Sequence, residues 1–496
     1  MLTTLTAPAF AGTWYIEDGD ITISAGESGN NVTQNNNTTY GDTNTIITNQ
    51  NKDTASSHTV TIEAKDKDDK VEVTLKDVNI DTSSRNKAAV SVTGEGDTNI
   101  KLDGDNALKS DIYRSGIYGS GSGSLTISGG ENDSLTAQGG SGANGISSSG
   151  SLTISGGTVT ANGDDGGRGI SSSGSVTISG GSTVTANGGS GTISGGDGIC
   201  SSGGVTISGG STVTANGGNG GSLVGGDGIR SDGGVTISGG TVKAAGGDSK
   251  DGYGGDGIRS GGGVTISGNT VNAAGGNGGK VGGYGICSFD RVAISGGTVE
   301  AAGGNGSTGG GSGIYSSVID LSGSLELTAK AGSPNGKALS QKGSELVLDT
   351  IKDKLGPGAK VTATDADGKV IDQVSTPRPV EPEESSSSSD GGSAAPSAPA
   401  SPLPGLTVTD KDGQRISYTS TQSGNTLTVC VGRFTASFRI SLAALRQLRA
   451  EGIETIAFQT VLCSTTLSVD ELLAMGGENA EAVLTHRFTD SSLTVG

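Results

Sequence analysis

Short apolar segments separated by glycine pairs recur through the middle of the chain. A Gly-Ile pair places isoleucine at eight positions that lie 24 to 30 residues apart: Ile117, Ile146, Ile170, Ile199, Ile229, Ile258, Ile286 and Ile314. In most units a V-T-I or L-T-I segment follows, and then T-V-x-A, as in residues 205–207 and 212–215. Apolar and polar residues alternate within these segments, which is the period of a half-buried strand. The repeat therefore predicts three short strands per unit, with sharp corners at the glycine pairs.

Units of this length predict a parallel β-helix in which each unit forms one coil and isoleucine stacks on isoleucine. One coil buries too few aliphatic side chains to offset the cost of ordering its backbone, so stability must come from stacking many coils. Low-complexity disorder is the alternative, but it predicts no fixed register of apolar residues. The unit lengths vary in glycine-rich segments such as residues 217–226, which we expect to be loops at one corner.

The regular coils and their terminal coils occupy residues 117–374, preceded by less regular coils and a cap at residues 13–116. We expect residues 71–75, 78–80, 89–92 and 99–102 to be strands, and the Asn/Thr-rich residues 30–51 to be a loop. The last coils are expected to run through residues 319–327 and 346–348. The whole segment is therefore predicted to be all-β.

A Pro/Ser/Ala-rich linker at residues 375–404 precedes a small α+β domain at residues 405–496. Strands are predicted at residues 426–431, 436–440, 455–461 and 482–485. A helix is predicted at residues 442–451, with Ser441 as its N-cap, and a capping box at Ser468 predicts a second short helix. The chain stops in an apparent strand, so we expect this domain to be truncated.

Composition and charge narrow the classes of function. Glycine makes up 92 of 496 residues and aromatic residues only 3%, so an ordinary core of leucine and rings is ruled out. Collagen is excluded because glycine does not recur at every third position. The net charge of −19 makes nucleic acid an unfavourable partner. No run of 18 apolar residues occurs, so we expect no membrane-spanning segment.

The first twelve residues resemble the end of an export signal. Residues 9–11 read A-F-A, the small-x-small pattern of a cleavage site, although a basic region before them is missing. We therefore interpret residues 1–12 as a residual signal peptide and expect a secreted or cell-surface protein. A plain N-terminal tail is the alternative.

Residues 71 to about 327 contain the segments VEVTLKDVNID and NIKLDGDNALKS and the repeated GGDGI-x-S…VTISGGTV units. Through these motifs the segment resembles a carbohydrate-binding β-helix family of Gram-positive gut and cellulolytic bacteria. This resemblance implies the right-handed parallel β-helix of pectate lyases. It also implies a secreted or surface-attached protein that binds plant polysaccharide and calcium without lyase activity.

We call the isoleucine of each Gly-Ile pair the anchor isoleucine. Three acidic residues lie two positions before it in consecutive units: Asp197, Asp227 and Asp256. Stacking should bring these carboxylates together, and a hard cation with oxygen ligands would relieve their repulsion. They are our candidate Ca²⁺ ligands. The alternative is that they are solvated turn residues, because Asp favours Gly-Asp-Gly turns in any case.

Candidate ligand-binding residues lie near the same anchors. Arg230 and Arg259 each follow an anchor isoleucine in adjacent units, and Tyr284 and Tyr315 lie two positions before and one after theirs. With the aspartates, the arginines outline a polysaccharide lyase, in which a cation neutralises a uronate and a base removes a proton. The alternative is two solvated surface arginines.

The cysteines and histidines indicate no catalytic set. Cys200 and Cys287 are three coils apart, roughly 14 Å, which is beyond disulfide reach, so we expect free thiols. Cys430 and Cys463 could pair if their strands are neighbours. His58 and His486 lie in different domains, so neither a metal cluster nor a Ser/His/Asp set can be assembled from them.

These features favour non-catalytic binding of a polysaccharide or host glycan, assisted by calcium, at the cell surface. The alternative is a structural stalk or adhesin that binds protein, for which the C-terminal domain would offer a second surface. A polysaccharide lyase is the third and weakest hypothesis.

Overall fold

The computed structural model describes most of the chain as two compact units, Met1–Glu383 and Glu384–Gly496. The described residues are 11–377, 405–410, 414–416, 418–423, 425–431, 435–460, 464–475, 480–487 and 490–495. Most of the predicted linker therefore lies outside them, as does the predicted signal segment except for its last two residues. Each unit is described by itself below.

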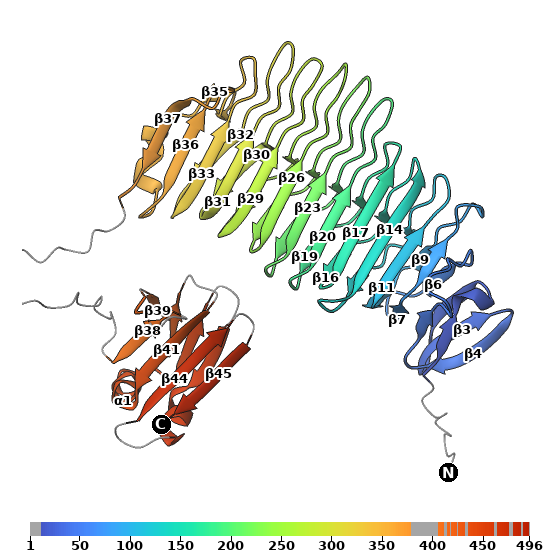
Figure 1. Cartoon of the computed structure of the whole chain (residues 1–496), viewed down its shortest axis with the longest axis horizontal. Helices are drawn as coiled ribbons and strands as arrows, with labels where there is room; N and C mark the ends of the chain where they lie inside the picture. The colour runs from blue at the N-terminus through green and yellow to red at the C-terminus, as the bar shows by residue number, and fades with distance from the viewer. Residues whose placement is uncertain are drawn as a thin grey trace, which may run out of the picture. The chain divides into compact units, whose positions relative to one another are not determined.

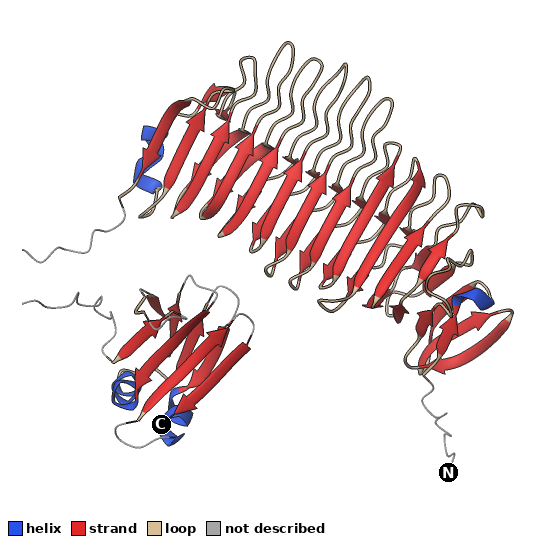
Figure 2. Ribbon diagram, in the orientation of Figure 1, coloured by secondary structure: helices blue, strands red, loops and turns tan. Residues whose placement is uncertain are grey.

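The first unit is a β-solenoid of about 13 turns, built from stacked parallel coils (Figure 1). Its strands form one 25-stranded and one 12-stranded sheet. The predicted parallel β-helix is thereby confirmed. Strands dominate the unit and short helical turns lie near its two ends (Figure 2).

A regular coil contains three strands, as the repeat predicts. One coil comprises β21 (Ile199–Ser201), β22 (Val205–Ser208) and β23 (Thr212–Asn216), and each pairs in parallel with its counterpart in the next coil. The other strands of the regular region are β12 (Ile117–Gly119), β13 (Leu125–Ser128), β14 (Ser134–Ser141), β15 (Ile146–Ser148), β16 (Leu152–Ser155), β17 (Thr158–Asp164), β18 (Ile170–Ser172), β19 (Val176–Ser179), β20 (Thr183–Asn187), β24 (Ile229–Ser231), β25 (Val235–Ser238), β26 (Thr241–Ala245), β27 (Ile258–Ser260), β28 (Val264–Ile266), β29 (Asn269–Ala274), β30 (Ile286–Ile294) and β31 (Gly297–Ala302).

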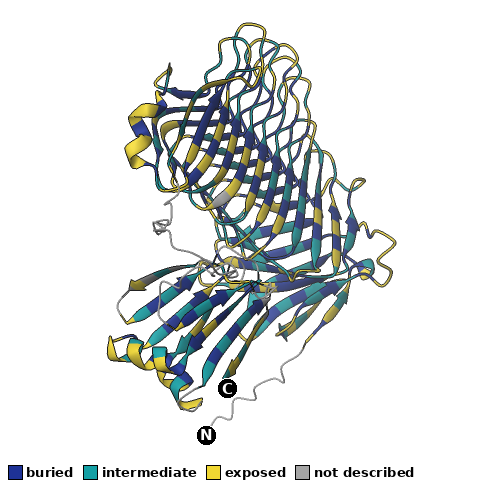
Figure 3. Cartoon of the chain, turned by 60° about the vertical axis from the view of Figure 1, so that its left-hand side comes forward, coloured by how far each residue is buried: buried dark blue, intermediate teal, exposed yellow. Residues whose placement is uncertain are grey.

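The core consists of thin aliphatic stacks. In the coil above, Ile199, Val205, Ile207, Val213 and Ala215 are all at most 1% exposed. Each stacks on an identical residue in the following coil, and buried and accessible positions alternate along the strands (Figure 3). Five small side chains fill the interior of each coil, which explains why the core needs so few aromatic rings.

Glycine-rich loops project from one edge of the solenoid as a row of similar turns (Figure 1). They are bonded to one another: the N–H of Gly247 donates to the carbonyl of Gly226 at 2.8 Å, and the N–H of Gly276 to that of Gly255 at 2.8 Å. A Cβ on Gly255 would lie 2.0 Å from the Gly226 oxygen. Glycine is needed here because neighbouring backbones approach too closely for any side chain.

The N-terminal coils are capped by a hairpin that the sequence interpretation missed. The expected loop at residues 30–51 instead contains β3 (Gly29–Gln34), β4 (Asn37–Asp42) and β5 (Ile46–Thr48), and β3 pairs antiparallel with β4. Asn35 and Asn36 form the turn with φ of 53° and 61°, a left-handed conformation that asparagine tolerates. The remaining elements here are β1 (Thr13–Tyr15), η1 (Ile16–Asp18), β2 (Ile21–Gly26), β6 (Val60–Ala64), β7 (Lys70–Lys76), β8 (Asn79–Asp81), β9 (Val90–Gly94), β10 (Asp97–Asp103) and β11 (Asp105–Lys109).

The far end of the solenoid is closed differently from the prediction. Residues 346–348 do not form a strand, and a 3₁₀ helix, η2 (Leu348–Lys354), begins there. The terminal strands are β32 (Ile314–Leu321), β33 (Leu325–Lys330), β34 (Leu339–Gln341), β35 (Ser344–Glu345), β36 (Lys360–Thr364) and β37 (Val370–Ser375). Because β37 pairs antiparallel with β36, it ends the parallel stack.

The second unit is β-rich with two helices. It contains β38 (Leu406–Thr409), β39 (Thr419–Ser423), β40 (Thr426–Cys430), β41 (Thr435–Ser441), α1 (Leu442–Ala450), β42 (Thr455–Gln459), β43 (Ser464–Ser468), α2 (Val469–Met475), β44 (Glu481–Arg487) and β45 (Asp490–Val495). These strands form two four-stranded sheets around Phe438 and Phe458, whose ring centroids are 4.6 Å apart. Ser441 caps α1, as predicted, by accepting from the N–H of Ala444 at 3.2 Å. Among the described helices, none is long and apolar enough to span a bilayer.

Candidate functional site

A column of side chains on the outer side of the solenoid follows the anchor residues from coil to coil. We call it the outer column. Backbone register places its members directly beside one another, so Arg230 lies next to Arg259. In coil order it comprises Thr61, Ser91, Tyr118, Ser147, Ser171, Cys200, Arg230, Arg259, Cys287, Tyr315 and Ser340.

The three predicted aspartates form a buried ladder beside this column. Asp197, Asp227 and Asp256 are only 6%, 6% and 4% exposed, so the interpretation as solvated turn residues is wrong. Oδ1 of Asp197 accepts from the N–H of Asp227 at 2.9 Å, and Oδ1 of Asp227 from that of Asp256 at 2.7 Å. Oδ1 of Asp256 accepts from the N–H of Tyr284 at 2.7 Å. Each side chain thus replaces a backbone acceptor for the following coil.

Arginines neutralise two members of this aspartate ladder. Nε of Arg168 lies 3.1 Å from Oδ2 of Asp197, and a guanidinium nitrogen of Arg259 lies 3.5 Å from Oδ2 of Asp256. Asp227, between them, forms no ion pair with any described residue. One buried carboxylate of the three therefore lacks a directly paired cation.

Burial makes ionisation of the inner aspartates unfavourable. Burial raises the pKa of Asp227 well above its usual value, and the neighbouring carboxylates of Asp256 and Asp197 raise it further. Burial also raises the pKa of Asp256 to about 6, against the opposing effects of the Tyr284 N–H and the Arg259 guanidinium. These two carboxyl groups therefore bind protons more readily than ordinary surface acids.

A groove of about 630 Å³ lies over the ladder and the outer column. Its floor is largely glycine backbone, and its charged lining residues are Arg168, Asp197, Asp227, Arg230 and Arg259. Arg230 forms no ion pair with a described residue. The groove therefore offers guanidinium donors and carboxylate acceptors side by side.

Aromatic side chains follow at the C-terminal side of this groove. Tyr284 and Tyr315 stack with ring centroids 4.9 Å apart and planes 19° apart. The guanidinium of Arg259 lies 5.5 Å from the ring centre of Phe289, which is 56% exposed. The predicted tyrosines therefore belong to one aromatic pair, and Phe289 presents a separate ring to Arg259.

Calcium remains a prediction. No group of three or more His, Cys, Asp or Glu side chains in the described residues is arranged to hold a metal ion. Ca²⁺ takes 6–8 oxygen ligands, whereas in the ladder each Oδ1 accepts a backbone N–H and two of the three Oδ2 atoms face arginine. An ion would have to share these oxygens.

The thiols of the solenoid are free, as predicted. Burial raises the pKa of Cys200 to about 11 and that of Cys287 to about 12, so both are poor nucleophiles. Cys430 is also a free cysteine, and Cys463, considered as its partner, lies outside the described residues.

The histidines lie in separate surroundings. His58 contacts Asp20 through Nδ1 at 3.2 Å, whereas His486 is buried, packs edge-on against Phe438 and contacts Thr465 at 2.9 Å. Burial lowers the pKa of His486.

Sequence reasoning missed three contributors to the groove region. Arg168 and Asn144 occupy the same position before their anchors as the aspartates do, and Oδ1 of Asn144 accepts from the N–H of Arg168 at 2.8 Å. An amide and a carboxylate at equivalent repeat positions signal a hydrogen-bonding ladder. Phe289 gave no comparable signal, because it has no counterpart in other units.

Comparison of the chain with protein-family models, with curated proteins and with solved structures finds no match.

Proposed function

We propose that the solenoid binds an acidic polysaccharide without cleaving it, along the groove over the aspartate ladder. The observation that carries the proposal is the placement of Arg230 and Arg259 side by side in a 630 Å³ groove, with Tyr315 of the Tyr284–Tyr315 pair two coils further along the outer column. A charged groove in register with the strands suits a ligand that is itself a repeating chain.

Each part of the groove matches one part of a sugar chain. Guanidinium groups bind carboxylates through paired, charge-assisted hydrogen bonds. Oδ2 of Asp227, which lines the groove, would accept from sugar hydroxyls, and the half-buried Tyr315 ring, stacked on Tyr284, would pack against the apolar face of a sugar. The resemblance to carbohydrate-binding β-helix proteins supports the same ligand class and a secreted or surface location.

Calcium belongs to this proposal as an assisting ion. A divalent cation near Asp227 would relieve the repulsion within the ladder and bridge to a uronate carboxylate. Titration of Ca²⁺ followed by thermal melting tests this part alone, and the absence of stabilisation at millimolar Ca²⁺ would remove it while leaving the arginine contacts in place.

The test is calorimetry with oligogalacturonate, with and without EGTA. The double variant Arg230→Ala/Arg259→Ala is expected to weaken binding about 10-fold to 100-fold, the effect of losing charge-assisted hydrogen bonds. Arg291→Ala is the matched control, because Arg291 is exposed and paired with Asp320 away from this groove. Equal binding by both variants would contradict the proposal, and a rise in absorbance from an unsaturated product would contradict its non-catalytic part.

One observation favours a second candidate, a stalk or adhesin that binds protein. The tips of three consecutive glycine-rich loops carry Ile193, Leu223 and Tyr253, which are 63%, 54% and 51% exposed. Such an apolar row suits a protein partner more than a sugar. A glycan array without hits, together with loss of cell adhesion in a Leu223→Ser variant, would favour this candidate. The second unit would then offer a further protein-binding surface.

A further inference from the structure

A second groove lies on the same face of the solenoid, towards its N-terminus. It measures about 310 Å³ and is lined by Thr59, Thr61, Asn86, Lys87, Ala88, Ser91, Arg114 and Tyr118. Its lining contains two cations and no acid, although the whole chain carries a net charge of −19. Local basic chemistry against such a background is typical of a site for an anion.

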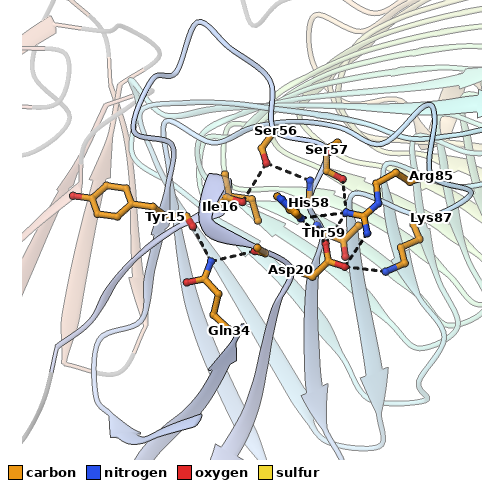
Figure 4. Close-up of polar contacts among 11 residues, drawn as sticks. Tyr15, Ile16, Asp20, Gln34, Ser56, Ser57, His58, Thr59, Arg85 and Lys87 are labelled. Atoms are coloured by element: carbon orange, nitrogen blue, oxygen red, sulfur yellow. Dashed lines mark hydrogen bonds and ion pairs between the residues drawn. The ribbon is translucent and has the colours of Figure 1, made fainter. Parts of the chain in front are cut away.

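Lys87, one of these two cations, belongs to a charge cluster beside the groove in which positive groups outnumber negative ones. Lys87 and Arg85 both pair with the single carboxylate of Asp20, at 3.0 and 2.9 Å, and His58 contacts it as well (Figure 4). Although burial disfavours the ionised form of Asp20, hydrogen bonds from Lys87, the Thr59 N–H and Arg85 outweigh it and hold its pKa well below the usual range. One fixed negative charge therefore faces two permanent positive charges.

Arg114 is the second cation in the lining of the groove. Its Nε donates to Oδ1 of Asn86 at 3.3 Å, and it forms no ion pair with a described residue. The nearby carboxylate of Asp111 accepts from the backbone N–H groups of Asn86 and Ile112. The guanidinium of Arg114 keeps most of its donors for a ligand.

Polar hydroxyls and an aromatic face complete the groove. Thr61, Ser91 and Tyr118 are consecutive members of the outer column, on β6, β9 and β12. The Tyr118 side chain is 43% exposed. Cations, hydroxyls and a ring face in one groove match an acidic sugar better than a bare phosphate, which would need no ring.

The two grooves adjoin along the outer column. Ser147, which follows Tyr118 in the column, belongs to the coil where the lining of the first groove begins, at Gly142 and Asn144. Only the small residues Ser147, Ser171 and Cys200 lie between Tyr118 and Arg230, four coils or roughly 19 Å apart. Nothing bulky in the column separates the two grooves.

We infer that Lys87, Arg114 and Tyr118 form a second binding site for a carboxylated or sulfated sugar, in line with the first groove. The site stands on its own geometry. Its further role, holding one extended chain together with the first groove, rests on the proposed function. Occupying both sites with one chain raises affinity through effective concentration, without any new contact.

Calorimetry on the full chain with short and long acidic oligosaccharides tests this inference. Probes are galacturonate di- and dodecasaccharides, the heparin-derived sulfated equivalents, and a neutral gluco-oligosaccharide; the first two distinguish the two anion types. The variant is Arg114→Ala/Tyr118→Ala, whose side chains are exposed. The matched control is Arg291→Ala/Tyr40→Ala, which removes the same charge and a ring that is 74% exposed.

The wild type is expected to bind two disaccharides per chain, and the Arg114/Tyr118 variant one. For the dodecasaccharide, affinity should fall about 10-fold or more in this variant and stay unchanged in the control. Unchanged stoichiometry and affinity in the variant would overturn the second site while leaving the proposed function intact. Conversely, if the Arg114/Tyr118 variant loses binding and the Arg230/Arg259 variant does not, the second site stands and the proposed function falls.

Discussion

Oδ1 of Asp227 accepts a 2.7 Å hydrogen bond from the backbone N–H of Asp256, its counterpart in the next coil. The bond holds two buried carboxylates in adjacent coils close together, although like charges repel. Arg259 pairs with only the second of them. The ladder therefore provides continuous hydrogen bonding between coils, although its neighbouring carboxylates repel each other.

The buried carboxyl groups of the aspartate ladder should make the stability of the fold depend on pH. The pKa of Asp256 is raised in the fold to about 6, above the unfolded value of roughly 3.9. Such a group contributes stability that is complete below pH 4 and is lost as the pH rises through 6. Thermal melting of the wild type should therefore show the free energy of unfolding falling from pH 5 to pH 7.5, by an amount on the order of 1–3 kcal/mol.

Asp227→Asn should flatten this profile and raise the melting temperature at pH 7.5. Asparagine can still accept the Asp256 N–H, as Asn144 does in its own coil, but it carries no charge to repel Asp256. Asp232→Asn is the control, because Asp232 is exposed in the same coil. A profile as steep as that of the wild type would contradict the assignment of the pH dependence to the ladder.

The glycine-rich loops should tolerate substitution according to backbone spacing. A Cβ on Gly311 would lie 1.8 Å from the carbonyl oxygen of Gly283, so Gly311→Ala is expected to destabilise the solenoid by several kcal/mol or to separate the coils locally. In the same loop, a Cβ on Gly309 would lie 3.8 Å from the nearest atom, the Cγ1 of Val281. Chemical denaturation should therefore show Gly309→Ala close to wild type, and equal effects would argue against close packing.

The aliphatic stacks should be sensitive to single truncations. Ile207 is fully buried, and Ile207→Ala is expected to cost about 2–5 kcal/mol through lost burial and the remaining cavity. Ile193, at 63% exposure, is the matched control, and its alanine variant should unfold within about 0.5 kcal/mol of wild type. Urea unfolding of both variants measures the difference, and similar losses would contradict the assignment of the core.

Thiol labelling should follow burial. In a Cys463→Ser background at pH 8, Cys430 should react with iodoacetamide fastest, Cys200 more slowly, and Cys287, whose pKa is about 12 and which is 1% exposed, only after unfolding. Mass spectrometry of timed samples gives the order. Rapid modification of Cys287 in the folded protein would show that its coil opens.

The repeat determined the stacking of coils because the Gly-Ile pair recurs at the same place in every unit and so admits one register, although the unit lengths vary. The positions of Ile199 and Ile229 in the sequence were enough to predict that they stack. The turn at Asn35 and Asn36 could not be told from a loop in the sequence, since the flanking strands are polar and lack a strong alternation.

Chain sequence by itself determined the solenoid, its three strands per coil, the adjacency of Arg230 and Arg259, and the free thiols at Cys200 and Cys287. Only tertiary structure decided that the aspartate ladder is buried and that Lys87, Arg114 and Tyr118 share a groove. The physical reason is that a periodic core propagates from one coil to the next through local rules. Side-chain burial and charge pairing, as between Asp20 and Lys87, depend instead on atoms brought together from distant residues.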